Sequence, residues 1–163
     1  MKEEEEYIDW KITKGIISAL KRCTTENGFN TNVKQVELVR KSMKQFEYPL
    51  CVVIPKETMP QIEFTIRNDI LPFLIFYSDG QLEENDTTGI SFIERYKDVQ
   101  GDLQVVLKQS LYTEGELSGI AQNLEIEYYS HDIIEDGIYQ EEVVILQVNV
   151  ERTIDPDNPK NVM

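Results

Sequence analysis

Few residues of this chain have the type and spacing that catalysis needs. The single histidine, His131, has no serine or cysteine nucleophile in an elbow motif to activate, because Ser130 is only its neighbour along a strand end. The chain contains neither a Walker A sequence nor a GxGxxG loop for phosphate. We therefore expect a protein that is not an enzyme and that binds no cofactor, with a small hydrolase of unrecognised type as an alternative.

The two cysteines, Cys23 and Cys51, form no CxxC pair, and one histidine adds too few ligands for a zinc site. Disulfides are rare in proteins kept inside cells. The first six residues, with four consecutive glutamates, do not resemble a cationic signal peptide. No apolar run reaches the ~20 residues of a membrane span. The sequence thus predicts two buried free thiols in an intracellular protein without membrane contact.

A cluster of carboxylates lies between two apolar segments, at Asp79, Glu83, Glu84 and Asp86. Carboxylate oxygens are ligands for divalent cations, but the spacing of these four residues does not match an EF-hand loop. The sequence favours a solvated acidic loop over a metal site.

Charge is distributed unevenly along the chain, whose net charge is −14. Residues 1–50 hold 9 basic and 8 acidic residues, whereas residues 51–163 hold 7 basic and 22 acidic residues. Such a surface repels the phosphates of nucleic acids, so sequence-specific DNA or RNA binding is disfavoured. A wall past which DNA slides, or a mimic of DNA, is compatible with this charge.

Apolar periodicity predicts two helices. The first spans residues 7–24, and its apolar stripe consists of Ile8, Ile12, Ile16, Ala19 or Leu20, and Cys23. The second begins at the capping box Ser91–Glu94 and ends near Tyr112. Gly101, in its middle, predicts a bend or a close approach to the sheet.

Strand signals fill much of the remaining chain and give the element order α-β-β-β-α-β-β. Strands are predicted at residues 49–54, 70–77, from 124 onward and at 140–153. Residues 33–40 form a strand or, alternatively, a short helix, with the strand favoured by their three valines. Residues 61–67 form a half-buried strand or the outer part of a hairpin. We expect Asn68-Asp69 to end the segment of residues 61–67 before the strand at 70–77 begins. The predicted fold is α+β, a mostly antiparallel sheet of about five strands with two main helices on one face. It forms a single domain over residues 1–153, followed by a flexible tail or arm at 154–163.

Two features are candidates for contacts with another subunit or partner. Trp10 lies off the apolar stripe of the first helix, which predicts either a partly buried rim residue or a contact residue. Arg40, Lys41 and Lys44 form a basic cluster that is either a solvated face or a subunit contact.

The predicted elements follow an order that resembles a known family. The pattern opens with a helix ending in Ile16–Lys21 and continues with Tyr48–Pro55, a Tyr-Pro pair followed by aliphatic residues. A second apolar strand, an acidic loop and a long helix come next, and the last hairpin closes in Val148–Glu151. Over roughly residues 5–153 the chain resembles the tail-terminator and tail-completion (neck) proteins of long-tailed bacteriophages.

This resemblance implies a structural virion protein of the tail or neck, made in the host cytoplasm. Such proteins form rings, commonly hexamers, that cap the tail tube and join it to the head–tail connector. The expected partners are therefore further copies of the chain, the tail tube protein and the connector protein. DNA would pass through the ring without specific binding. Either the acidic loop with Asp79, Glu83, Glu84 and Asp86 or the acidic C-terminal hairpin would face the lumen, while residues 1–50 would help to make subunit contacts. A neck adaptor or stopper, or an acidic DNA-mimic inhibitor or regulatory protein, stays open as an alternative.

Overall fold

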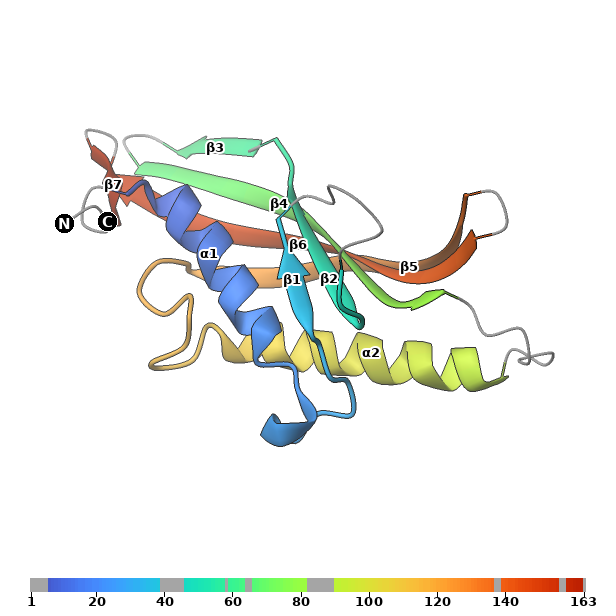
Figure 1. The fold of residues 1–163 in the computed structure, drawn as a ribbon. Helices are drawn as coiled ribbons and strands as arrows, with labels where there is room; N and C mark the ends of the chain where they lie inside the picture. The colour runs from blue at the N-terminus through green and yellow to red at the C-terminus, as the bar shows by residue number, and fades with distance from the viewer. Residues whose placement is uncertain are drawn as a thin grey trace.

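The computed structural model describes residues 6–38, 46–57, 59–63, 66–81, 90–136, 139–155 and 158–162. Two helices and one mixed sheet make up these parts of the chain, which confirms the predicted α+β fold (Figure 1). The elements are α1 (Ile8–Lys21), η2 (Thr25–Asn27), β1 (Gln35–Glu37), β2 (Leu50–Pro55), β3 (Met59–Glu63), β4 (Ile66–Gln81), α2 (Ile90–Gln109), β5 (Asn123–Asp136), β6 (Tyr139–Asp155) and β7 (Asn158–Val162).

The main strand order of the sheet is β1-β2-β4-β6-β5, so β1 and β5 are the two ends of this order. Only β1 and β2 run parallel; every other pair is antiparallel. The predicted C-terminal hairpin is confirmed, because β5 and β6 pair from Asn123↔Glu151 to Asp136↔Tyr139. Off this path, β3 pairs with β4 and β7 pairs with β6.

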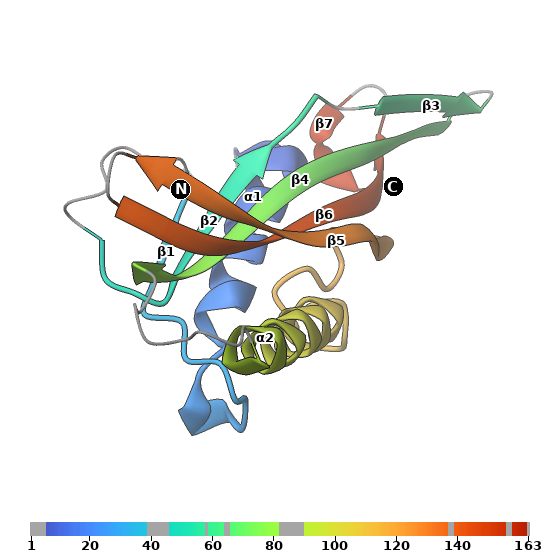
Figure 2. The same cartoon turned by 90° about the vertical axis from the view of Figure 1, so that its right-hand side faces the viewer.

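Both helices lie on the same face of the sheet (Figure 2). Contacts place α1 against β1 and β2, and α2 against β5 and β6. The predicted stripe of α1 is confirmed, since Ile12, Ile16 and Leu20 are completely buried against the sheet. Cys23 and Cys51 are buried free thiols in the same core, as predicted.

Asn68-Asp69 does not separate two strands, contrary to the prediction. Strand β4 runs without a gap through Asn68-Asp69, which pair with Thr153 and Arg152 of β6. Asp69 is buried, and its Oδ2 accepts a hydrogen bond from Arg152 Nη1 at 2.6 Å. The carboxylate therefore has a charged partner inside the sheet, which removes the usual reason for aspartate to end a strand.

Gly101 makes no close approach, contrary to expectation. It is exposed within the continuous helix α2, and a Cβ built there would meet no atom within 4 Å. The close approach occurs at Gly15 of α1, where a Cβ would lie 2.6 Å from Leu117 Cδ2. Glycine at this position lets the segment of residues 110–122 pack directly on α1.

The C-terminal segment is more regular than the predicted flexible tail. Strand β6 continues to Asp155, and β7 pairs with its end through Ile154↔Val162 and Asp155↔Asn158. The sequence pattern pointed to a tail because of its prolines, but a proline such as Pro159 is tolerated in an edge strand.

Candidate functional site

The described residues contain no group of three or more His, Cys, Asp or Glu side chains that could hold a metal ion. Burial raises the pKa of the Cys23 thiol to about 12, and burial raises that of Cys51 as well. Both thiols are therefore protonated at neutral pH and inaccessible, which makes them poor nucleophiles. His131 lies in β5, opposite Val144 of β6.

Asp79, a predicted lumen residue, belongs to a small network at the end of β4. Arg95 of α2 binds both carboxylate oxygens, with Nε–Oδ2 and Nη2–Oδ1 distances of 3.1 Å. Tyr77 donates its hydroxyl to Asp79 Oδ1 at 2.6 Å and accepts from Arg95 Nη2 at 2.7 Å. The charge of Asp79 is thus balanced within the chain. Glu83, Glu84 and Asp86 lie outside the described residues.

The exposed side of α1, which we call the outer face, combines exposed aromatic residues with lysines. Residues three or four positions apart share a side of a helix, and the outer face consists of Tyr7, Trp10, Lys11, Lys14, Ser18 and Lys21. Trp10 is 43% exposed and Tyr7 is 57% exposed. Among the predicted contact residues, Trp10 therefore lies at the surface, whereas Arg40, Lys41 and Lys44 fall outside the described residues.

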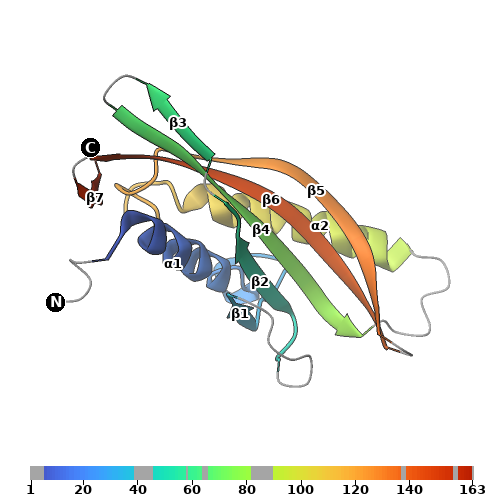
Figure 3. The ribbon, with the colours of Figure 1, turned by 90° about the horizontal axis from the view of Figure 1, so that it is seen from above.

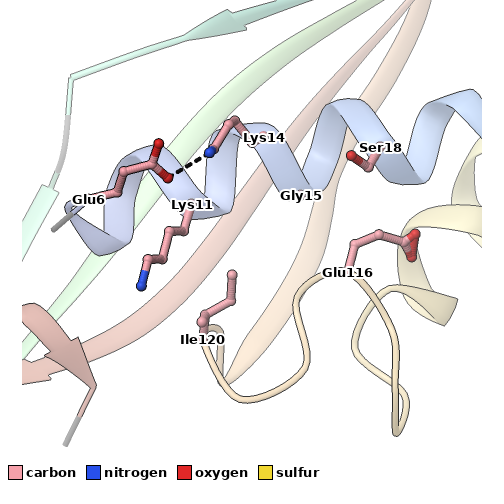
Figure 4. A pocket seen from close by; sticks show the side chains of 7 residues that line it. All are labelled: Glu6, Lys11, Lys14, Gly15, Ser18, Glu116 and Ile120. Carbon is pink, nitrogen blue, oxygen red and sulfur yellow. Dashed lines mark hydrogen bonds and ion pairs between the residues drawn. The ribbon is translucent and has the colours of Figure 1, made fainter. Parts of the chain in front are cut away.

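A hollow of about 530 Å³ separates the outer face from the segment of residues 110–122. It is lined by Glu6, Lys11, Lys14, Gly15, Ser18, Glu116 and Ile120 (Figure 4). Lys14 forms an ion pair with Glu6 at 2.6 Å. Lys11 has no ion pair among the described residues. Its side chain extends away from the Lys14–Glu6 pair, on the side of α1 where Ile120 lies (Figure 4).

The far wall of the hollow is fixed to α1 by a bidentate ion pair. Arg22 binds Glu116 through Nε–Oε2 at 2.6 Å and Nη2–Oε1 at 2.8 Å. Burial raises the pKa of the Glu116 carboxyl, but the hydrogen bonds from Arg22, a backbone hydrogen bond and the positive charge of Arg22 together outweigh burial, so the pKa lies below its usual value. Glu116 is consequently ionised at neutral pH and holds the wall in place.

A second hollow, of about 480 Å³, lies at the sheet edge beside β1. Lys21 and the exposed Lys34 line it, together with residues 33 and 35–37. The lysines of the outer face, Lys11, Lys14 and Lys21, are thus joined at the end of α1 by Lys34, which shares the second hollow with Lys21.

Arg152 anchors α1 to the sheet through a buried cluster that the sequence analysis missed. Its guanidinium binds Asp69 through Nη1 and binds Asp9 of α1 through Nε and Nη2, with an Nη2–Oδ2 distance of 2.8 Å. Alternation along β6 places Arg152 on the same buried face as Val148 and Val150, and this spacing was the signal in the sequence that Arg152 is buried. The cluster fixes the start of α1 and thereby the position of Trp10.

The structure shows no helix among its described parts that is long and apolar enough to cross a membrane. No protein-family model matches the chain, and a search of curated proteins finds no significant match to it.

Proposed function

We propose that the chain is a structural subunit of a bacteriophage tail, a tail terminator that assembles into a ring between the tail tube and the head–tail connector. The observation that carries an assembly role is the outer face of α1, where Trp10 and Tyr7 are exposed among lysines. The resemblance of the sequence to tail-terminator proteins directs this role to the phage tail.

Exposed aromatic side chains on a rigid helix favour a protein contact over a reaction centre. Trp and Tyr are enriched at the centres of interfaces, where they supply much of the binding energy. Trp10 is also held on a well-anchored element, because Asp9 beside it binds the buried Arg152. A preorganised anchor loses little conformational entropy when a partner covers it.

The net charge of −14 supports passage of DNA through the ring. A wall of like charge repels the phosphate backbone and prevents it from binding as it moves. Because Asp79 is paired with Arg95, we assign the lumen charge mainly to Glu83, Glu84 and Asp86. Replacing these three residues with Gln or Asn should leave the ring intact and slow the passage of DNA.

Negative-stain electron microscopy of the purified protein tests the proposal. We expect closed rings with a central hole for the unmodified chain and a marked loss of rings for Trp10→Ala, with Val105→Ala, also at an exposed apolar helix position, as the matched control. A protein that stays monomeric and competes with DNA for a DNA-processing enzyme would instead support the DNA-mimic alternative.

A further inference from the structure

We propose that neighbouring subunits join head to tail. The lysine side of one copy, formed by Lys11, Lys14, Lys21 and Lys34, docks on the acidic β5 edge of the next copy, formed by Glu125 and Glu127. This inference rests on the proposed ring and names the two surfaces that would build it. The occupant of the lysine side is thus a second copy of this chain.

The lysine side is a local exception in an acidic protein. Residues 6–22 carry four basic and two acidic side chains, whereas the whole chain has a net charge of −14. Both acidic side chains of this segment are paired, Glu6 with Lys14 and Asp9 with Arg152. Lys11 has no ion pair among the described residues, so it is available to an incoming carboxylate.

The strand at the other end of the sheet order carries complementary charge among its described side chains. The sequence of β5 contains no lysine or arginine, and its first half holds Glu125 and Glu127. Glu125 and Glu127 are exposed, and Glu127 is held by hydrogen bonds from Gln147 Nε2 at 2.5 Å and Asn149 Nδ2 at 3.0 Å. These acids are therefore positioned at the surface before any partner binds.

The two charged surfaces lie on different sides of the molecule. Strands β1 and β5 are the two ends of the sheet order. Helix α1 packs against β1, β2 and β7, whereas α2 packs against β5 and β6. Figure 3, which looks onto the sheet, shows α1 and β1 on one side and β5 on the other. One copy can therefore use both surfaces at once, each with a different neighbour.

The separation of the two charged surfaces favours head-to-tail contacts over two-fold contacts. A two-fold contact would place β5 acids against β5 acids, or α1 lysines against α1 lysines, and like charges in contact are repulsive. A head-to-tail contact instead pairs lysines with carboxylates at every interface. Repeated contacts of this type close into a ring when the rotation between copies closes.

Reciprocal charge reversal tests the proposal. The pair Lys11→Glu/Lys14→Glu and the pair Glu125→Lys/Glu127→Lys should each weaken self-association by about 100-fold, because attraction becomes repulsion at every interface. An equimolar mixture of the two variants should restore rings, since each reversed surface meets a complementary one on the other variant. Sedimentation velocity at matched concentrations measures all three samples, and thermal unfolding confirms that each variant is folded.

The matched control for the lysine pair is Lys56→Glu/Lys97→Glu, which makes the total charge more negative by the same amount as Lys11→Glu/Lys14→Glu, at two exposed lysines outside both surfaces. It should leave association unchanged. If the unmodified chain forms rings that survive both reversals, or if the mixture fails to restore rings from folded variants, the interface assignment is wrong and the ring stands. If the unmodified chain is monomeric at every concentration, the ring and this interface both fall.

Discussion

At the scale of single residues, two glycines in helices have opposite roles. Gly101 is exposed in α2 with no atom near its missing Cβ, whereas Gly15 lies against Leu117 and the backbone of Glu116. Glycine costs a helix interior up to about 1 kcal/mol relative to alanine, mainly through the entropy of the unfolded chain. Gly101 is therefore a site where stability can be gained, and Gly15 is required by packing.

Gly101→Ala should raise the free energy of unfolding by about 0.5–1 kcal/mol. Gly15→Ala is the comparison variant and should lower it by about 1–3 kcal/mol, because the added methyl overpacks a buried contact. Urea unfolding followed by circular dichroism measures both. Equal effects of the two substitutions would show that the packing of residues 110–122 on α1 is not as described.

Tyr77 links stability to alkaline pH. Burial, followed by the charge of Asp79, raises the pKa of the Tyr77 hydroxyl above its ordinary value of 10. Above pH 10 the raised pKa keeps the hydroxyl protonated in the folded chain while the same hydroxyl ionises in the unfolded chain. The contribution of Tyr77 to the free energy of unfolding is therefore complete below pH 10 and is lost as the pH rises further. Tyr77→Phe should reduce the fall in unfolding free energy above pH 10. A variant with the same alkaline slope as the unmodified chain would contradict this assignment.

At the scale of elements, one buried cluster determines how α1 sits on the sheet. Arg152 is 2% exposed and bonds to the fully buried Asp69 and to Asp9 of α1. Removing one member of a buried ion pair leaves the other charge uncompensated. The cluster therefore commits β4, β6 and α1 to a single arrangement.

Arg152→Met should lower the free energy of unfolding by about 3–5 kcal/mol, because Asp69 would remain as a buried charge without its cation. Arg95→Met is the matched control, since its Asp79 partner is 47% exposed at the side chain and the loss should be about 1 kcal/mol or less. Chemical denaturation measures both losses. A loss from Arg152→Met no larger than that of the control would refute the anchoring role.

Elements whose signals are local could be predicted from the sequence, and contacts between distant segments could not. The stripe of Ile8, Ile12 and Ile16 and the C-terminal hairpin depend only on periodicity and turn residues, and both are confirmed. The Arg152–Asp69 pair joins residues 83 positions apart through the register of β4 and β6. Without that register, the sequence predicted that Asp69 would end a strand. The hollow beside α1 likewise depends on how residues 110–122 fold back, which periodicity does not encode.

At the scale of the whole molecule, the proposed ring would draw its direction of assembly from charge separation. In that ring, the lysines of α1 and Lys34 beside β1 would face the exposed Glu125 and Glu127 of the next copy. Contacts of this kind weaken as salt screens them. We expect the proportion of assembled protein to fall when sodium chloride is raised from about 0.1 M to about 1 M. Assembly that is insensitive to salt would point to an apolar interface instead.

Native mass spectrometry of the unmodified protein is the decisive test of whether this chain is a ring-forming subunit. We expect a closed oligomer, a hexamer by the family resemblance, with a single stoichiometry that does not grow as the protein concentration rises. A monomer at every concentration, or an open series of ever larger species without a preferred size, would contradict it.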